Sequence, residues 1–588
     1  MSQRQTVSRG ALAVTIDGAD LRDIRWAGME VVRRIYPVFQ DRNWTSRPFR
    51  ITQHSITETD QAMAFRAEGA GSFDAEHLRW SVEARISERD MDVRFTATTS
   101  AAFLRNRLGL CVLHPMSAAG APCTVHHVDG SVTRAHLPED ISPAQPFLDI
   151  RSIEHEPAAD MLVRISFEGD TFEMEDHRNW SDASFKTYCT PISRPFPVTV
   201  NPGDTIDQSL RVAITTTSDP DVPHHHGGHD IQVSPTTSRL PSLGVVISPS
   251  DLDSPQIAEL AELSLAHLHV VIDPRSPEAI TDVQRAARAA RSIGSRLHVA
   301  TTCESPTDLG VFAALDHDSA ATIERWYVFS ASSKVTPNAW CSAARTALGE
   351  LSADWMLTGG TDLYFTELNR ETPSEGGFDA VNFSLNPQVH SFDDRTLIQN
   401  AATQRVIAEN AARISGSVPI CVCPITLRPR FNPNATDPES DMSNTPLPSD
   451  VDARQRSWFA ACWAAMSLKY LSAPGTVGTA TYFEAFGWKG IAAGADPSPD
   501  PENFPFTPGE HFPVWEVLSA VAGACNAHET TASRPEEVDA LVISSEDGHR
   551  ALVANWTDTE QTVTLTGVVR TQIHVPPRSF TVHDLTPR

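Results

Sequence analysis

This chain of 588 residues has little positive charge and no long apolar run. Lysine and arginine number 47 against 74 aspartates and glutamates, and the resulting net charge of -27 argues against a nucleic-acid or anionic-membrane partner. A small anionic substrate is not excluded, because it needs only a local basic pocket. No apolar segment is long enough to span a bilayer, and residues 1–20 contain no signal-peptide core. We therefore expect a cytoplasmic protein.

The chain also lacks a cysteine framework and the common cofactor motifs. Its 9 cysteines are scattered and odd in number, without paired Cys-x-x-Cys motifs, which favours reduced thiols over disulfides or a zinc ribbon. A dinucleotide glycine motif, a P-loop, a Gly-x-Ser-x-Gly elbow and a His-Glu-x-x-His pair are missing. The histidines of the first 180 residues and the cluster at 224–229 lack metal-ligand spacing, so we predict no metal and no cofactor.

Length and residue pattern predict a multidomain α/β plus β protein. A chain of 588 residues with 40% hydrophobic and 21% charged residues should fold into several globular domains. Alternating segments over residues 1–218 predict an N-terminal antiparallel β-sandwich domain. Residues 219–243 are rich in Ser, Thr, Pro and Gly, and we interpret them as a linker. Alternation returns over 532–588 and predicts a small C-terminal β-sandwich.

Residues 244–531 alternate between short apolar runs and helical patterns. This pattern predicts a central (β/α)8 TIM barrel, which would be the catalytic domain. The expected strands are residues 245–248, 268–273, 297–302, 326–330, 355–358, 380–384, 420–423 and 478–483. In such barrels the chemistry lies at the C-terminal ends of the strands. Candidate catalytic residues are therefore sought there.

The run from 172 to 188 mixes charges of both signs, His, Asn and aromatic rings without a clean period. A solvated face would carry fewer rings, and a core strand would carry fewer charges. Aromatic bodies beside charged and amide groups are typical of a pocket for a polar small molecule such as a sugar acid. The candidate binding residues in this run are Arg178, Asn179, Trp180, Lys186 and Tyr188.

Two glutamates follow predicted strand ends. Glu367 comes after the fifth strand and Glu484 ends the eighth, and strands three apart face each other across a closed barrel. Two facing carboxyls suit acid/base or nucleophilic chemistry on a sugar. A salt bridge at the barrel rim explains Glu367 equally well. Glu484 lies among aromatic residues, including Trp488, in a setting that resembles a sugar-stacking wall.

Polar loops after the sixth and seventh strands add further candidates. Asn386 and His390 lie in a segment suited to orienting hydroxyls or moving a proton, although an ordinary hydrogen-bonded loop explains it nearly as well. Arg428 and Arg430 bracket a proline, and their guanidinium groups suit an anionic substrate. Pairing of these arginines with Glu484 or nearby aspartates is the structural alternative.

Several segments of the chain resemble bacterial D-apionate lactonases. They are the 172–188 run, the proline-containing segment 141–147, the Gly-Gly-Thr at 359–361 and the aromatic segment 482–488. The resemblance covers essentially the whole chain, including its three-part layout. It implies an enzyme that opens D-apionolactone in cytoplasmic sugar catabolism.

The barrel part also resembles retaining glycoside hydrolases of the large TIM-barrel clan. That resemblance implies an alternative function with Glu367 and Glu484 as the catalytic pair. Those enzymes place the acid/base glutamate after an Asn at the end of strand four and the nucleophile on strand seven. Here the two glutamates follow strands five and eight, and Thr366 precedes Glu367.

We predict a sugar-acid lactonase that converts D-apionolactone to D-apionate. Glu484 is expected to activate water, with Glu367 or His390 as the acid on the leaving hydroxyl. Contacts to the oxyanion or carboxylate are expected from Arg428, Arg178 and Lys186, and sugar packing from Trp180, Tyr188 and Trp488. A retaining glycosidase is the alternative, and a non-catalytic carbohydrate-binding protein ranks third. The expected partner is a small-molecule sugar lactone or glycoside, and homo-oligomerisation is left open.

Overall fold

The computed structural model describes residues 4–44, 46–47, 49–59, 62–71, 77–217, 228–349, 351, 354–371, 377–416, 418–431, 446–545 and 548–585. These residues form two compact units. The first contains the described residues up to 217 except 179–182, and the second contains 179–182 together with those from 228 onward. The histidines at 224–226 lie outside the described residues. Within these ranges, no helix has the length and apolar character needed to cross a membrane.

The first unit is built from β-strands. Its core consists of inward-facing residues such as Val82, Phe95 and Ile165, which alternate with exposed positions along their strands. All strand pairings among its described residues are antiparallel, so the mostly-β prediction for this domain is confirmed, and the sandwich layering stays a prediction. The strands are β1 (Gln5–Arg9), β2 (Leu12–Asp17), β3 (Asp20–Trp26), β4 (Met29–Asp41), β5 (Phe49–Glu58), β6 (Met63–Gly71), β7 (Leu78–Ile86), β8 (Asp90–Thr99), β9 (Phe103–Pro115), β10 (Pro122–His127), β11 (Val132–His136), β12 (Phe147–Ala158), β13 (Met161–Glu168), β14 (Phe172–Asp176), β15 (Ser184–Tyr188), β16 (Val198–Val200) and β17 (Thr205–Thr216).

Eight parallel strands of the second unit close into a barrel. Each pairs with the next along the chain, and the pairing of the first strand with the last closes the ring. The strands are β19 (Ser242–Val246), β20 (His267–Val271), β21 (Arg296–Cys303), β22 (Ile323–Ser330), β23 (Met356–Tyr364), β24 (Ala380–Leu385), β25 (Ile420–Ile425) and β26 (Val477–Phe486). β24 and β25 are buried at every position, as expected for parallel strands covered on both faces. The predicted barrel is confirmed.

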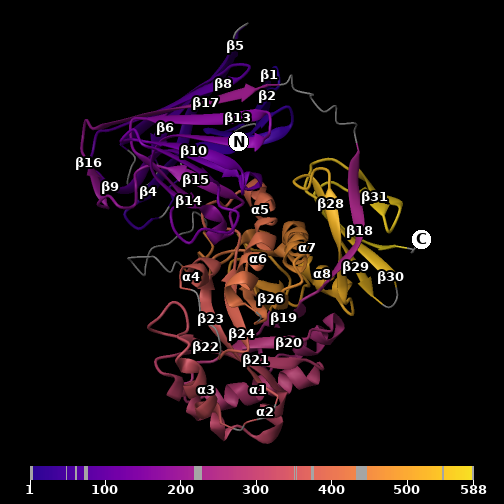
Figure 1. Ribbon diagram of the computed structural model, residues 1–588. Helices are drawn as coiled ribbons and strands as arrows, with labels where there is room; N and C mark the ends of the chain where they lie inside the picture. The colour runs from indigo at the N-terminus through magenta and orange to yellow at the C-terminus, as the bar shows by residue number, and fades with distance from the viewer. Residues whose placement is uncertain are drawn as a thin grey trace. The chain divides into compact units, whose positions relative to one another are not determined.

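Helices cover the outside of the barrel, as Figure 1 shows for its magenta and orange part. In the first of them, Val283, Ala286, Ala287 and Ala290 are buried at helical spacing, so one face packs inward and the arginines face outward. The helices are α1 (Ala279–Ser292), α2 (His317–Thr322), α3 (Trp340–Leu348), α4 (Phe365–Arg370), α5 (Asp394–Asn400), α6 (Thr403–Ser415), α7 (Trp458–Ser472) and α8 (Val514–Val521). A short strand, β27 (Gly490–Ala492), pairs with β26 beyond the barrel mouth.

Among the described residues, strands from before and after the barrel form a seven-stranded sheet, which corrects the linker prediction for 228–243. Residues 219–227 of that predicted linker lie outside the described residues. Residues His229–Arg239 form strand β18, which pairs with β28 and β31 and lies in magenta among the yellow strands of Figure 1. Burial alternates at His229, Ile231 and Val233, a strand period that the Ser- and Thr-rich composition hid. The other strands are β28 (Asn526–Ala532), β29 (Val538–Ser545), β30 (Gly548–Asn555), β31 (Gln561–Gly567), β32 (Thr571–Val575) and β33 (Ser579–Leu585), so the sheet also begins before residue 532.

Helix α7 joins the barrel to this sheet. It is buried almost all round, as expected for a helix packed between two layers. Its Lys469 Nζ donates to Asp539 of β29 at 2.5 Å, and the Tyr470 hydroxyl donates to the same carboxylate at 3.0 Å. A buried charge pair that is also hydrogen-bonded fixes the register of the two layers, because either partner left alone would be an uncompensated buried charge.

Candidate active site at the barrel mouth

A cavity of about 200 Å³ lies at the C-terminal ends of the barrel strands. Residues of β19, β20, β23, β25 and β26 line it together with residues that follow β25 and β26. This is the end of the barrel where catalytic groups are expected. The lining residues are Val246, His269, Val271, Asp362, Pro424, Thr426, Leu427, Arg428, Arg430, Asp450, Asp452, Gln455, Phe483, Glu484 and Lys489.

Glu484 lies on the last barrel strand and is held by a lysine. Its Oε1 is 2.9 Å from Nζ of Lys489, and the same ammonium donates to Asp450 at 2.9 Å. Burial by itself lowers the pKa of Lys489, but Glu484 and Asp450 outweigh that effect and raise it. Phe483, the residue before Glu484, has a φ of 57°, a conformation that costs a non-glycine residue about 1–3 kcal/mol. The packing around Phe483 holds the backbone in this conformation, which sets the orientation of the neighbouring Glu484 side chain.

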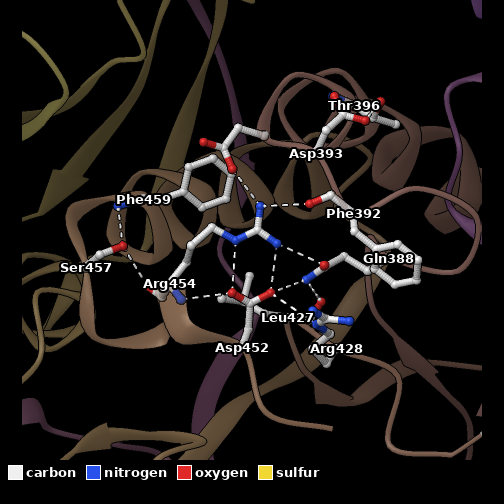
Figure 2. A network of polar contacts seen from close by, with 11 residues as sticks. Gln388, Phe392, Asp393, Thr396, Leu427, Arg428, Asp452, Arg454, Ser457 and Phe459 are labelled. Carbon is white, nitrogen blue, oxygen red and sulfur yellow. Dashed lines mark hydrogen bonds and ion pairs between the residues drawn. The ribbon is translucent and has the colours of Figure 1, made fainter. Parts of the chain in front are cut away.

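A second ionic network forms one wall of the cavity (Figure 2). The Arg454 guanidinium grips the Asp452 carboxylate with two hydrogen bonds of 2.9 and 2.8 Å, and Gln388 donates to the same carboxylate at 2.6 Å. Burial alone would raise the pKa of Asp452, but the hydrogen bonds and charge of Arg454 outweigh it and hold the pKa at about 2. Arg428 completes the wall with Nε 3.4 Å from Asp452. Asp452 thus positions Arg428 at the cavity.

Arg430 and Asp362 pair across the cavity at 2.9 Å, with the arginine reaching from the loop after β25 to the end of β23. Asp362 also lines a neighbouring cavity of about 360 Å³ with Phe431, Lys334 and serines of the loop after β22. The structural alternative considered for Arg428 and Arg430 is therefore what the structure shows, since each is paired with an aspartate. Pairing does not remove them from the cavity, which both still line.

His269 brings an imidazole to the same cavity from the middle of β20. Its Nδ1 lies 3.3 Å from Sγ of Cys423, which belongs to the barrel interior. Burial, followed by the nearby positive charge of Arg430, lowers the pKa of His269 to about 3. The ring is therefore neutral near pH 7, where it offers one N–H donor and one acceptor nitrogen.

Of the predicted site residues in this unit, Glu484 and Arg428 line the cavity. Glu367 does not stand at a strand end but within α4, where its Oε1 accepts from Lys334 Nζ at 3.1 Å. Asn386 is buried and accepts from the Gln388 backbone N–H at 3.0 Å. Trp488 is half-buried, with its ring 6.5 Å from that of Phe504. None of these three is among the residues that line the cavity within the described ranges.

Residues 179–182 of the polar run belong to the barrel unit and contact its polar groups. The Asn179 carbonyl accepts from the Thr366 hydroxyl at 2.6 Å, and its side-chain oxygen accepts from Asn369 at 2.8 Å. His390 Nδ1 lies 2.6 Å from the Asp182 carboxylate, and its ring meets the Trp180 ring edge-on at 5.5 Å. Residues 179–182 and the His390 loop, which lie far apart in sequence, thus come together within the barrel unit.

The remaining predicted binding residues lie in the first unit and have partners there. Arg178 donates to both oxygens of Asp176 and to the carbonyls of residues 138, 139 and 140. Lys186 Nζ donates to Glu175 at 3.0 Å, and the Tyr188 hydroxyl donates to Glu173. All three side chains are buried. Within the first unit they support the fold of the run, and their predicted contacts with substrate stay predictions.

Sequence reasoning missed several lining residues, namely His269, Asp362, Asp450, Asp452 and Lys489. His269 was missed because it lies in the middle of β20, whereas the strand-end rule selects only residues at the C-terminal ends of strands. Asp362 and Lys489 lie inside segments already singled out for Glu367 and Glu484. Asp450 and Asp452 follow a long segment after β25, and no local pattern in the sequence links them to the barrel mouth.

The cavity combines four carboxylates, those of Asp362, Asp450, Asp452 and Glu484, with three cations and a neutral imidazole. A carboxylate can accept a proton from water, and N–H donors can hold the charge that develops on a carbonyl oxygen. Together with the closed parallel barrel, these groups define a TIM-barrel enzyme of the hydrolase class.

Comparison with known proteins gives the family. The model for the D-apionate lactonase N-terminal domain matches residues 1–217, and the model for the D-apionate lactonase TIM barrel domain matches residues 243–526. The chain belongs to the D-apionate lactonase family. A D-apionate lactonase from Brucella anthropi is 28% identical over 597 aligned positions, which cover 95% of this chain and 93% of that protein.

Solved structures that match part of the chain at low identity include a glucanase-xylanase and an endoxylanase. CelM2, a bifunctional glucanase-xylanase from a metagenome library, is 8% identical with a TM-score of 0.42, covering 62% of this chain and 100% of its own. A GH30 endoxylanase from Clostridium papyrosolvens C71 is 8% identical with a TM-score of 0.39, covering 60% of this chain and 99% of its own.

Proposed function

We propose that this chain opens the lactone ring of a sugar acid in the barrel cavity, with D-apionolactone as the expected substrate. The observation that carries the proposal is Glu484, a strand-end carboxylate in one cavity with Arg428, Arg430 and Lys489. Family membership and the name of the Brucella relative support the lactone as substrate. A small polar lactone is also the class of ligand that a cavity of about 200 Å³ suits.

Glu484 acts as the base in this proposal. It takes a proton from water while the water oxygen attacks the lactone carbonyl carbon, and the carbonyl electron pair moves onto its oxygen. When that pair returns, the ring carbon–oxygen bond breaks and the protonated Glu484 gives its proton to the leaving oxygen. The product is a hydroxy acid, which releases its carboxyl proton to water near pH 7. Arg428 is placed to donate to the lactone oxygens before the attack and to the product carboxylate after it.

The roles predicted for the other site residues remain predictions. Glu367 and His390 as acids have partners of their own, Lys334 and Asp182, outside the residues that line the cavity. Substrate contacts by Asn179, Trp180, Asn386 and Trp488 also remain predictions, as does a cytoplasmic location.

The alternative, a retaining glycosidase, has less support from the barrel. Its expected glutamate positions at the ends of strands four and seven are occupied by Ser330 and Ile425. Glu367, the partner it would need for Glu484, is tied to Lys334 within α4. A retaining mechanism needs two carboxyl groups about 5 Å apart across one substrate.

A substrate panel tests the proposal. The purified chain should hydrolyse D-apionolactone, followed by pH-stat or loss of lactone absorbance, and leave aryl glycosides intact. Glu484→Gln should lower kcat by about 1,000-fold, since general-base catalysis is worth about 100- to 10,000-fold. Glu409→Gln is the matched control, because Glu409 is a half-exposed, ion-paired glutamate on α6. Glycoside turnover without lactone turnover would contradict the proposal.

A further inference from the structure

His269 lines the cavity beside Glu484, and its Nδ1 contacts a buried thiol on the side away from the cavity. His269 and Glu484 are both in register with Val246 of β19, on the two strands that flank it. Neighbouring strands lie about 4.8 Å apart, so the backbones of these two residues are about 10 Å apart. Both side chains line the cavity, so a small carbonyl compound placed between them would reach both.

The Nδ1 side of His269 faces the Cys423 thiol in the barrel interior. The sulfur of this thiol lies 3.3 Å from His269 Nδ1. Burial raises the pKa of the thiol, which therefore keeps its proton. An imidazole nitrogen is a better acceptor than a thiol sulfur, so the protonated thiol is placed to donate to Nδ1.

A neutral imidazole that accepts at Nδ1 carries its own proton on Nε2. Among the described residues, no hydrogen bond uses Nε2 of His269, although the ring lines the cavity. We propose that His269 is a further catalytic residue, whose Nε2–H donates to the lactone carbonyl oxygen and stabilises the oxyanion formed when water attacks. The imidazole keeps its proton throughout, and the proton from water goes to Glu484.

This inference rests on the proposed function, and three neutral substitutions test it. Leucine removes both nitrogens of His269, asparagine places an amide near the Nδ1 position, and glutamine reaches the Nε2 position. His269→Leu and His269→Asn should each lower kcat by about 100-fold with KM changed less than about threefold, the loss typical of one oxyanion donor. His269→Gln should recover about tenfold of that loss, because its amide N–H replaces the Nε2 donor.

The asparagine and glutamine variants separate donation to substrate from support of Cys423. If His269 acts only through the thiol, His269→Asn will be the active variant and His269→Gln the damaged one, and the proposal falls. Full activity of His269→Leu also overturns it. His317→Leu is the control, since that histidine is exposed on α2.

Two further measurements keep the outcomes separable. Cys423→Ser, which still donates to Nδ1, should stay within about threefold of the wild type, whereas Cys423→Ala should lose about tenfold in kcat as the tautomer preference weakens. Equal activity of the two Cys423 variants counts against a hydrogen bond from the thiol to His269 Nδ1. Glu484→Gln is assayed alongside. If Glu484→Gln is inactive and His269→Leu keeps wild-type activity, only the inference about His269 is rejected. If the wild type does not hydrolyse the lactone, the proposed function itself is rejected.

Discussion

The same Asp-x-Arg arrangement occurs in the first unit and at the barrel mouth, with different surroundings. In Asp176–Arg178 and in Asp452–Arg454 the arginine donates its backbone N–H and two guanidinium N–H groups to the aspartate two residues earlier. The first pair is sealed, with side chains 1% and 0% exposed. The second borders a cavity and shares its aspartate with Arg428.

The difference between the two ion pairs lies in their surroundings. Arg178 donates its other N–H groups to backbone carbonyls, so a ligand would have to break existing bonds to use it. Asp452 accepts two guanidinium hydrogen bonds from Arg454 and also pairs with Arg428, which lines the cavity. Residue type and spacing are equal in the two places. What differs is the space in front of the charged groups.

The largest expected effect comes from breaking the sealed pair. Arg178→Met should lower the free energy of unfolding by about 3–5 kcal/mol, because Asp176 would remain buried without its counter-charge. Urea unfolding followed by circular dichroism measures the change. An unaltered unfolding midpoint would show that the network around Arg178 adds no stability. It would then favour the substrate role first predicted for this residue.

At the barrel mouth the corresponding change should be smaller and depend on pH. The pKa of Asp452 is held at about 2 against an ordinary value of 3.8, which corresponds to about 2 kcal/mol of stability. Because the folded pKa is the lower one, this contribution is complete above about pH 4 and is lost as the pH falls toward 2. The difference in stability between wild type and Asp452→Asn should shrink over that window. A difference independent of pH would contradict the assignment.

Arg428 should affect binding more than stability. Arg428→Met leaves the Asp452–Arg454 pair intact and removes a charge-assisted donor, so KM for the lactone should rise about tenfold with little change in melting temperature. Initial-rate kinetics and thermal unfolding separate the two effects. A fall in melting temperature with unchanged KM would place Arg428 with Arg178 as a structural residue.

A third copy of the arrangement, Asp273–Arg275, provides the smallest expected effect. Its side chains are 51% and 60% exposed. Water already solvates both charges, so Asp273→Asn should leave stability and activity unchanged within error. Thermal unfolding and the lactone assay check this. A measurable loss would mean that spacing, rather than surroundings, sets the strength of these pairs.

The fold was more predictable from sequence than the site. Buried parallel strands tend to be continuous apolar runs, which is why all eight barrel strands could be located from sequence. The polar β23 runs six residues past its predicted end at 358. β18 was missed because only Ile231 and Val233 mark its buried face among polar residues. Glu484 and Arg428 were found by their place after strands. Asp452 and Lys489 were not, because their role depends on loops that meet only in the folded barrel.

The central claim is that the cavity beside Glu484 binds and opens the lactone. A crystal structure of Glu484→Gln soaked with D-apionolactone tests it directly. We predict a lactone in the cavity, its carbonyl oxygen within hydrogen-bond reach of His269 Nε2 and its carbonyl carbon one water away from residue 484. A lactone bound elsewhere, with this cavity empty, would contradict the account.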